Sequence, residues 1–99
     1  MNSLRRPFYG SLADDATTVI AGTNSTLILV DNANTGDGAM FHHDYDGAAT
    51  TLISDPDSMF YNTDTNGRVC VYSSGTNNSS FVLKNRTGST YVFEVRIVG

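Results

Sequence analysis

The 99-residue sequence has only one cysteine, one lysine and one glutamate, and it has no tryptophan or glutamine. A single cysteine cannot form an internal disulfide. Cys70 stands between Val69 and Val71, so we expect it to be a small buried side chain. Lysine, glutamate and glutamine usually cover helix surfaces, and their scarcity argues against helical structure. The absence of tryptophan removes a large aromatic side chain that often stacks on sugars.

The basic residues are few and scattered. The formal net charge is -4, and among the six basic residues only Arg5 and Arg6 are adjacent. Nucleic-acid binding needs a clustered basic footprint, so we expect no nucleic-acid partner. No apolar stretch approaches the length of a membrane span, and no apolar run follows Arg5 and Arg6 as it would in a signal peptide. We therefore expect no membrane partner and a chain that is made and folds in a cytoplasm.

Residues that favour turns and strands dominate the composition. The sequence holds 12 Thr, 10 Ser, 9 Asn, 9 Asp and 9 Gly, about half of all residues. Asn, Asp, Gly and Ser favour turns, whereas Thr, Val, Ile, Tyr and Phe favour strands. Eight short strands at close spacing predict an all-β fold over residues 16–99, a small antiparallel β-sandwich of the jelly-roll kind. The predicted strands are 17–21, 26–31, 39–44, 49–54, 58–61, 68–73, 80–84 and 90–98.

Residues 1–15 are predicted to form an extended N-terminal arm. Pro7 disfavours regular structure, and the apolar side chains of Leu4, Phe8 and Tyr9 follow no clear period. An arm with such side chains should either fold back on its own sheet or lie across a neighbouring molecule. Removal of residues 1–10 is then expected to leave the sandwich folded.

Two predicted strands have distinctive hydrophobic patterns. One face of strand 90–98 is apolar and consists of Tyr91, Phe93, Val95 and Ile97. Its opposite face is mixed, as expected if another subunit covers part of it, and consists of Val92, Glu94, Arg96 and Val98. Residues 26–31 are almost continuously apolar, which favours a strand that is buried on both sides.

Residues 62–67 (Asn-Thr-Asp-Thr-Asn-Gly) resemble the start of a calcium-binding loop, in which oxygen ligands occupy alternate positions before a glycine. The match is incomplete, because Asn62 replaces the first aspartate and Ser73 stands where a bidentate glutamate belongs. The favoured interpretation is therefore a β-hairpin whose type I′ turn is built on Asn66 and Gly67.

Other groups that could carry chemistry do not converge in the predicted fold. His42 and His43 are neighbours in a strand, so their side chains should point to opposite faces and cannot bind one metal ion together. Asp14–Asp15 and Asp55–Asp57 lie where turns are expected, and aspartate stabilises turns by bonding to nearby backbone. We therefore predict no catalytic residue, no metal site and no cofactor, and we expect that the protein is not an enzyme.

Two segments resemble a pattern of small structural proteins in bacteriophage and prophage virions. The first, Gly10-Ser-Leu-Ala-Asp-Asp-Ala16, precedes the first strand of the sandwich. The second begins at Asp64 with the Asn-Gly turn and the run Arg-Val-Cys-Val-Tyr, and it ends with Asn85-Arg-Thr-Gly and a final alternating strand. Related patterns occur in tail-fibre domains. The resemblance covers about half of the chain, and residues 22–60 have no counterpart in it.

The resemblance implies a jelly-roll-like structural protein, commonly a homotrimer, that decorates a phage capsid. Such a decoration or cement protein bridges neighbouring copies of the major capsid protein and stabilises the head without catalysis. It would be made in the host cytoplasm and would lie on the capsid surface of the virion. The capsid contact would be the arm, where arginine can bind carboxylates and aromatic side chains can act as anchors. Its residues are Leu4, Arg5, Arg6, Phe8 and Tyr9.

Two other functions remain open at this point. A tail-fibre or tailspike tip module would bind a host receptor or glycan through exposed Tyr, Asn and Asp in loops such as 32–38 and 44–47. A small lectin-like domain would bind calcium. The short chain and the absence of tryptophan favour the capsid role over the tail tip.

Overall fold

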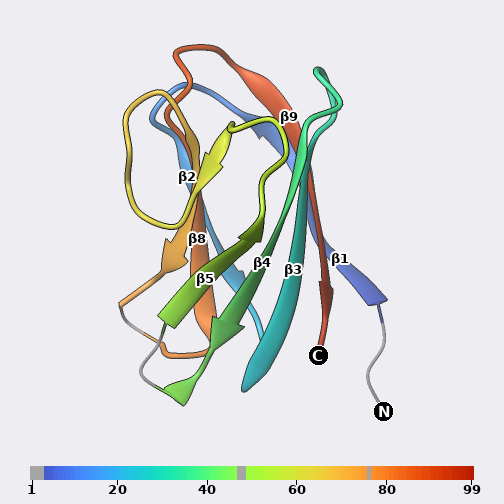
Figure 1. Cartoon of the computed structure of the whole chain (residues 1–99), viewed down its shortest axis with the longest axis vertical. Coiled ribbons are helices and arrows are strands. Elements are labelled where there is room, and N and C mark those ends of the chain that lie inside the picture. Colours follow the sequence, from blue (N-terminus) through green and yellow to red (C-terminus); the bar gives the residue numbers. More distant parts are fainter. Residues whose placement is uncertain (1–3, 47–48, 76) are drawn as a thin grey trace.

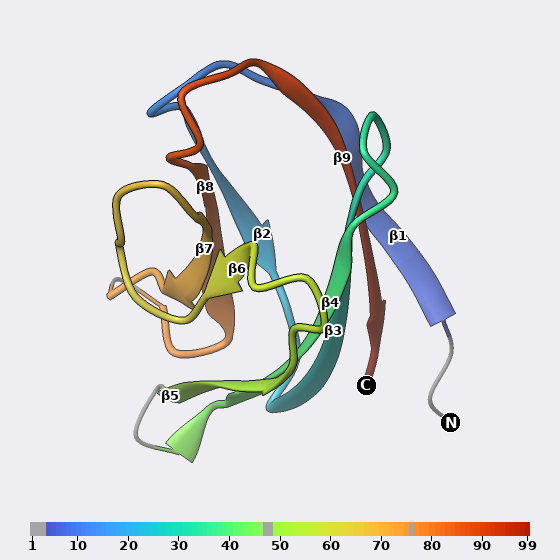
Figure 2. The same cartoon turned by 45° about the horizontal axis from the view of Figure 1, so that its top comes forward.

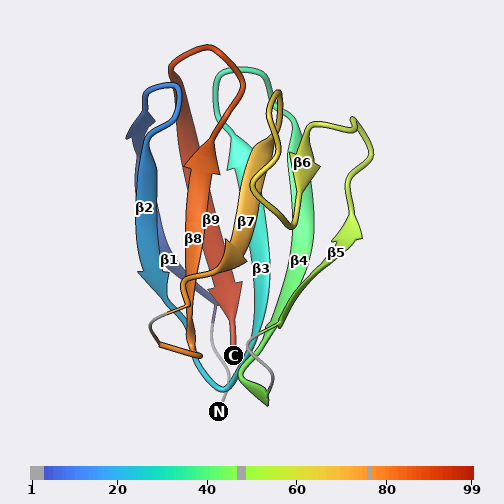
Figure 3. The same ribbon diagram turned by 90° about the vertical axis from the view of Figure 1, so that its left-hand side faces the viewer.

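The computed structural model describes residues 4–46, 49–75 and 77–99, which form nine strands and no α-helix. Two sheets pack face to face (Figure 3), one with the strand order β1-β9-β3-β4-β5 and the other with the order β2-β8-β7-β6. The predicted all-β sandwich is therefore confirmed. The strands are β1 (Leu4–Leu12), β2 (Thr17–Ala21), β3 (Ser25–Asn32), β4 (Gly38–Asp44), β5 (Ala49–Ser54), β6 (Phe60–Tyr61), β7 (Val69–Ser73), β8 (Ser80–Asn85) and β9 (Tyr91–Val98).

The two ends of the chain meet in the five-stranded sheet. β1 pairs with β9, and β2 pairs with β8 in the other sheet, so the beginning of the chain runs beside its end (Figure 1). This pairing is of the jelly-roll kind. β3, β4 and β5 follow as an antiparallel meander beside β9. No helix long and apolar enough to cross a membrane occurs in the part of the chain that the structure describes.

The core lies between the sheets and follows the alternation of the strands. In β9, Phe93, Val95 and Ile97 are fully buried, whereas the alternate residues from Val92 to Val98 face outward and are partly exposed. The predicted two-sided pattern of this strand is confirmed. Phe41 and Phe60 join the two sheets through an edge-to-face contact with ring centroids 6.4 Å apart. Each fully buried side chain of this size contributes about 1.5–3 kcal/mol.

Residues 4–12, expected to belong to an arm, form the edge strand β1. Of the two arrangements expected for the arm, these residues fold back on the chain's own sheet, where Phe8 packs against the core. The register with β9 shifts between Arg5 and Phe8, at the position of Pro7. Proline lacks an N–H group and is tolerated at such a bulge. Removal of residues 1–10 would take away most of this strand and uncover part of β9, so the sandwich is not expected to stay intact after that deletion.

β3 is buried on one side only, which corrects the prediction of a strand covered on both sides. Ile28 and Val30 are fully buried in the core, but Leu27 and Leu29 point away from it and are partly exposed. The apolar run therefore serves two different surfaces. One is the core, and the other is the outer face of the five-stranded sheet.

Asn85 joins the two segments that carry the phage resemblance. Its side-chain Nδ2 donates hydrogen bonds to the carbonyl oxygens of Leu12 (2.9 Å) and Ser89 (2.7 Å). Its Oδ1 accepts hydrogen bonds from the backbone N–H (3.0 Å) and the hydroxyl (2.7 Å) of Thr87. The Asp14 carboxylate accepts a further bond from the N–H of Gly88, whose φ of +91° suits glycine. These bonds tie the end of β1 and residue 14 to the turn between β8 and β9.

Candidate interaction surface

The outer face of the five-stranded sheet carries an apolar band. Leu4, Val98 and Leu27 lie opposite one another on β1, β9 and β3. Leu29 and Met40 are opposite each other in the next row. Such cross-strand neighbours contact each other on one face of a sheet. Leu4 is 58% exposed and the other four side chains are partly exposed, so the band is open to solvent in the single chain.

An ion-pair network crosses the same face beside the apolar band. Arg6 lies 3.2 Å from Glu94, and its guanidinium lies 5.1 Å from the centre of the Tyr9 ring. Arg96 lies 2.6 Å from Asp31 and 3.6 Å from the second oxygen of Glu94. Two arginines and two carboxylates from β1, β9 and β3 therefore compensate one another. The apolar band and the network adjoin each other, because Arg96 lies directly opposite Leu29.

The structure divides the five predicted contact residues between two sides of β1. Leu4, Arg6 and Tyr9 lie on the outer face, where Leu4 and Tyr9 are each 58% exposed. Arg5 and Phe8 lie opposite buried residues of β9 and therefore on the core-facing side. Phe8 packs against the core, whereas Arg5 is exposed. The sequence did not indicate that Leu27, Leu29 and Met40 extend the same surface, because their apolar character is equally typical of a core.

The other outer face, that of the four-stranded sheet, is covered in part by the chain itself. Residues 62–68 connect β6 to β7 and lie on the side of β7 that faces away from the five-stranded sheet (Figure 2). The backbone N–H of Thr65 lies 3.3 Å from the sulfur of Cys70, which is fully buried. Asp64 binds Lys84 (3.0 Å) and Arg86 (2.6 Å). The loop therefore shields one outer face, and the other has no such cover within the described residues.

Residues 62–67 do not form the predicted hairpin. β6 and β7 are parallel neighbours, and a tight turn can join only antiparallel strands. Gly67 has a φ of +86°, but Asn66 is not among the described residues with positive φ, as a type I′ turn requires. Both carboxylate oxygens of Asp64 contact cations of the chain, and Asn62 donates to the carbonyl oxygen of Thr50. These contacts hold the loop against the sheet.

Burial and ion pairing shift two pKa values beneath and within this loop. Desolvation raises the pKa of the Cys70 thiol, which favours the protonated and unreactive form. Hydrogen bonds from Lys84 and then Arg86 lower the pKa of Asp64. Asp64 is therefore a carboxylate over a wide pH range and serves as an anchor for the loop.

The two histidines point to opposite faces, as expected. His43 is fully buried; its Nε2 lies 2.6 Å from the carbonyl oxygen of Asn78, and its Nδ1 lies 2.7 Å from the Thr50 hydroxyl. Because a carbonyl oxygen only accepts, the proton belongs on Nε2. His42 is on the outer face, with its Nε2 2.8 Å from the Ser25 hydroxyl. The pair cannot act on one substrate or ion together.

The acidic pairs lie in turns. Asp55 accepts hydrogen bonds from the N–H groups of Met59 and Phe60, and Asp15 lies 3.0 Å from Arg86. A hydrogen bond with Asp37 raises the pKa of Asp57. Within residues 4–46, 49–75 and 77–99, no group of three His, Cys, Asp or Glu side chains is placed to hold a metal ion.

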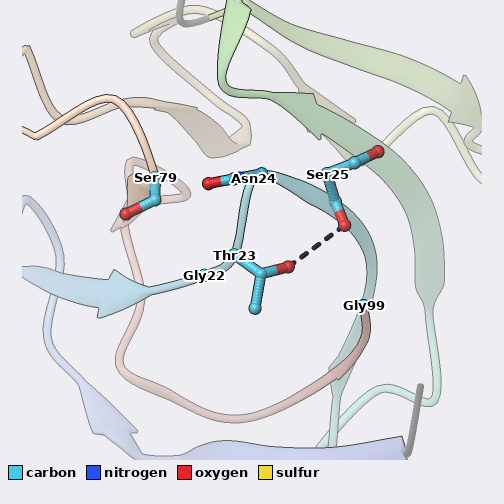
Figure 4. Close-up of a pocket in the computed structure, with 6 residues that line it drawn as sticks. All are labelled: Gly22, Thr23, Asn24, Ser25, Ser79 and Gly99. Atoms are coloured by element: carbon cyan, nitrogen blue, oxygen red, sulfur yellow. Dashed lines mark hydrogen bonds between the residues drawn. The ribbon is translucent and has the colours of Figure 1, made fainter. Parts of the chain in front are cut away.

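A shallow, open pocket lies where the β2–β3 turn meets the end of β9 (Figure 4). Its lining residues are small and carry no titratable side chain: Gly22, Thr23, Asn24, Ser25, Ser79 and Gly99. The Thr23 hydroxyl donates to the backbone carbonyl of Ser25 at 3.1 Å. The pocket can form hydrogen bonds with a ligand, but its lining supplies no acidic or basic side chain. The outer face of the five-stranded sheet is therefore the stronger candidate for function.

Comparison of the chain with protein-family models, with curated proteins and with solved structures found no match.

Proposed function

We propose that this protein is a non-catalytic structural protein of a phage virion, which decorates the capsid and stabilises the head by bridging neighbouring major capsid subunits. The observation that carries the proposal is the position of Leu4, Arg6 and Tyr9, which stand together and exposed on the edge strand β1. The resemblance at residues 10–16 and 64–97 supplies the link to virions.

The composition of β1 suits attachment to another protein. Contact with another protein would bury the apolar surface of Leu4 and Tyr9. Arg6, which is paired with Glu94, can pair with a carboxylate of the shell in place of Glu94 or together with it. One side of β1 has no partner strand within the described residues. Pro7 and the bulge beside it discourage indiscriminate pairing along that edge. A protein that binds only the assembled shell shifts the equilibrium toward the shell by mass action.

Immunogold electron microscopy tests the location. Antibody raised against the recombinant chain is applied to virus particles purified from lysates of the source organism. Gold spread over the heads is the expected result. Gold confined to the tail end would replace the proposal with a tip module that binds a host receptor or glycan, and unlabelled particles would remove the virion role.

A matched pair of variants tests the contact on β1. Leu4→Asp and Val19→Asp each replace an exposed aliphatic side chain, 58% and 62% exposed, with a carboxylate. Val19 lies on β2 in the other sheet. In co-sedimentation with purified shells, Leu4→Asp should reduce occupancy at least tenfold, whereas Val19→Asp should bind like the unaltered chain. Equal binding by both variants would exclude β1 as the contact.

A further inference from the structure

We propose that the outer face of the five-stranded sheet pairs with the same face of a second copy of this chain, turned end over end. The outward residues of β9 are Val92, Glu94, Arg96 and Val98, in the order apolar, acidic, basic, apolar. This row is complementary to itself when it is reversed. Val92 then meets Val98 of the second copy, and Glu94 meets Arg96.

The alternative face-to-face arrangements bring like charges together. If the two β9 strands ran in the same direction, Glu94 would meet Glu94 and Arg96 would meet Arg96. With the strands in the same direction, a sideways shift by one strand would still place Glu94 against Asp31, because these residues are opposite each other on β9 and β3. Like charges across an interface cost several kcal/mol. The favoured pair therefore has a two-fold axis perpendicular to β9, between Glu94 and Arg96.

The charges of the face are compatible with a second copy, whereas on β3 the turned pair places Leu29 against Asp31 of the second copy. The chain carries a net charge of -4, but Arg6 and Arg96 balance Glu94 and Asp31 here, so two copies repel each other least through this surface. In the turned pair, Arg6 lies over Tyr9 of the second copy, the same type of contact that it makes within its own chain at 5.1 Å. An interface in which one patch meets itself is the isologous contact of a dimer.

The size of the face sets the strength of the pair. From strand spacings, five strands of about seven residues cover roughly 500 Å² per copy, or about 1,000 Å² for the pair. This area is near the lower limit for a specific interface, so the dimer should be weak and should depend on concentration. The resemblance implied a homotrimer, whereas this face has two-fold complementarity.

The two-fold pair would also serve attachment to a shell, a step that rests on the proposed function. Rotation about an axis perpendicular to the strands reverses their direction but keeps their lateral order. β1 of one copy therefore lies on the same side as β1 of the second copy. The pair covers the outer-face side chains Leu4, Arg6 and Tyr9, so contact of a dimer with the shell would fall to Arg5 and the adjacent edges of β1 in the two copies. Two linked weak contacts bind more tightly than one.

Sedimentation of the purified chain, without any shell, tests the pair. The unaltered chain should shift from monomer to dimer as its concentration rises. E94R places arginine at both charged positions of the row, R96E places glutamate at both, and each should remove the dimer. The double variant E94R/R96E restores an acid opposite a base and should restore the dimer. V19E, on the other sheet, should dimerise like the unaltered chain, and circular dichroism establishes that each variant is folded.

A dilution series of the unaltered chain followed by nuclear magnetic resonance keeps the test independent of the variants. Amide signals of β9 and β3 should move with concentration, while those of β2 and β7 should stay fixed. A monomer at all concentrations, a trimer, or a double variant that is folded but remains monomeric would each overturn the inference. Shell binding by a strictly monomeric chain would leave the capsid proposal in place, and a dimer that binds no shell would leave the pairing in place.

Discussion

Replacement of Asn85 by alanine should destabilise the sandwich far more than the same replacement at an exposed asparagine. The Asn85 side chain is fully buried and makes four hydrogen bonds, two as donor and two as acceptor. Alanine would leave the carbonyl oxygens of Leu12 and Ser89 without these donors. A buried polar group that loses its partner costs about 1–3 kcal/mol, so we expect a loss of about 3–5 kcal/mol in the free energy of unfolding.

The measurement is urea denaturation followed by circular dichroism, with thermal melting as a second readout. A domain of this size is stabilised by about 5–15 kcal/mol in total, and each kcal/mol lost lowers its melting temperature by about 4–8 °C. N85A should therefore melt at least about 12 °C below the unaltered chain. N85D keeps both acceptor bonds to Thr87 but turns an oxygen toward two carbonyl oxygens, so it should be no more stable than N85A.

The matched control is N77A, because the Asn77 side chain also bonds to its neighbours but is exposed. Its Oδ1 accepts hydrogen bonds from the N–H (3.0 Å) and the hydroxyl (2.9 Å) of Ser79. Water can replace these bonds, and the cost should stay below about 1 kcal/mol. If N85A and N77A lost similar amounts, burial of the Asn85 network would not be what holds the two segments together.

Three further predictions concern the loop, the thiol and the buried histidine. The pKa of Asp64 in the folded chain lies below its ordinary value of 3.8, so its ion pairs stabilise the fold above that pH and are lost as the pH falls through the lowered pKa. In urea denaturation, D64N should therefore be less stable than the unaltered chain at pH 7. In strong acid the difference between the two should vanish. A D64N deficit that persists in strong acid would contradict this assignment. Cys70 is buried and its thiol has a raised pKa, so it should resist an aromatic disulfide reagent at pH 8 in the folded chain and react fully in guanidinium. Rapid labelling of the folded chain would show that residues 62–68 move away from Cys70. H43F should lower the free energy of unfolding by about 1–3 kcal/mol, because it removes the hydrogen bonds to Thr50 and Asn78. H42F should change the free energy of unfolding by less than about 1 kcal/mol. Equal effects of the two variants would show that the hydrogen bonds of His43 do not stabilise the fold.

Local sequence patterns were sufficient to place most strands. The predicted runs 17–21 and 49–54 have the bounds of β2 and β5, and the alternation in 90–98 gave the correct inner face of β9. In β2 and β9, side chains alternate between more and less buried positions, and turn residues mark the ends of all three strands. Where this local signal is clear, tertiary contacts reinforce it.

The failures occur where the structure depends on contacts between distant segments. For residues 1–15 the sequence left open whether the arm folds back on its own sheet or lies across a neighbour, because Pro7 interrupts the alternation. The pairing of residues 4–12 is settled by β9 at the other end of the chain. The Asn66–Gly67 pair does mark a turn, but the flanking strands run parallel, and Asp64 in the connecting loop is bound by Lys84 and Arg86 of a distant segment. Residue type alone could not indicate which ends of these strands would meet.

The uneven treatment of the two outer faces supports a partner for one of them. On the four-stranded sheet, the outward Cys70 and Val82 are buried in the single chain, where residues 62–68 lie over Cys70. On the five-stranded sheet, the outward Leu27 and Leu29 remain partly exposed. Single exposed apolar side chains also occur elsewhere, as at Val19 (62%) and Tyr61 (45%), but Leu4, Val98 and Leu27 are direct neighbours across three strands. A contiguous apolar patch, unlike a single exposed side chain, is typical of an interaction surface, which is why we expect the charge-swap variants of β9 to control assembly.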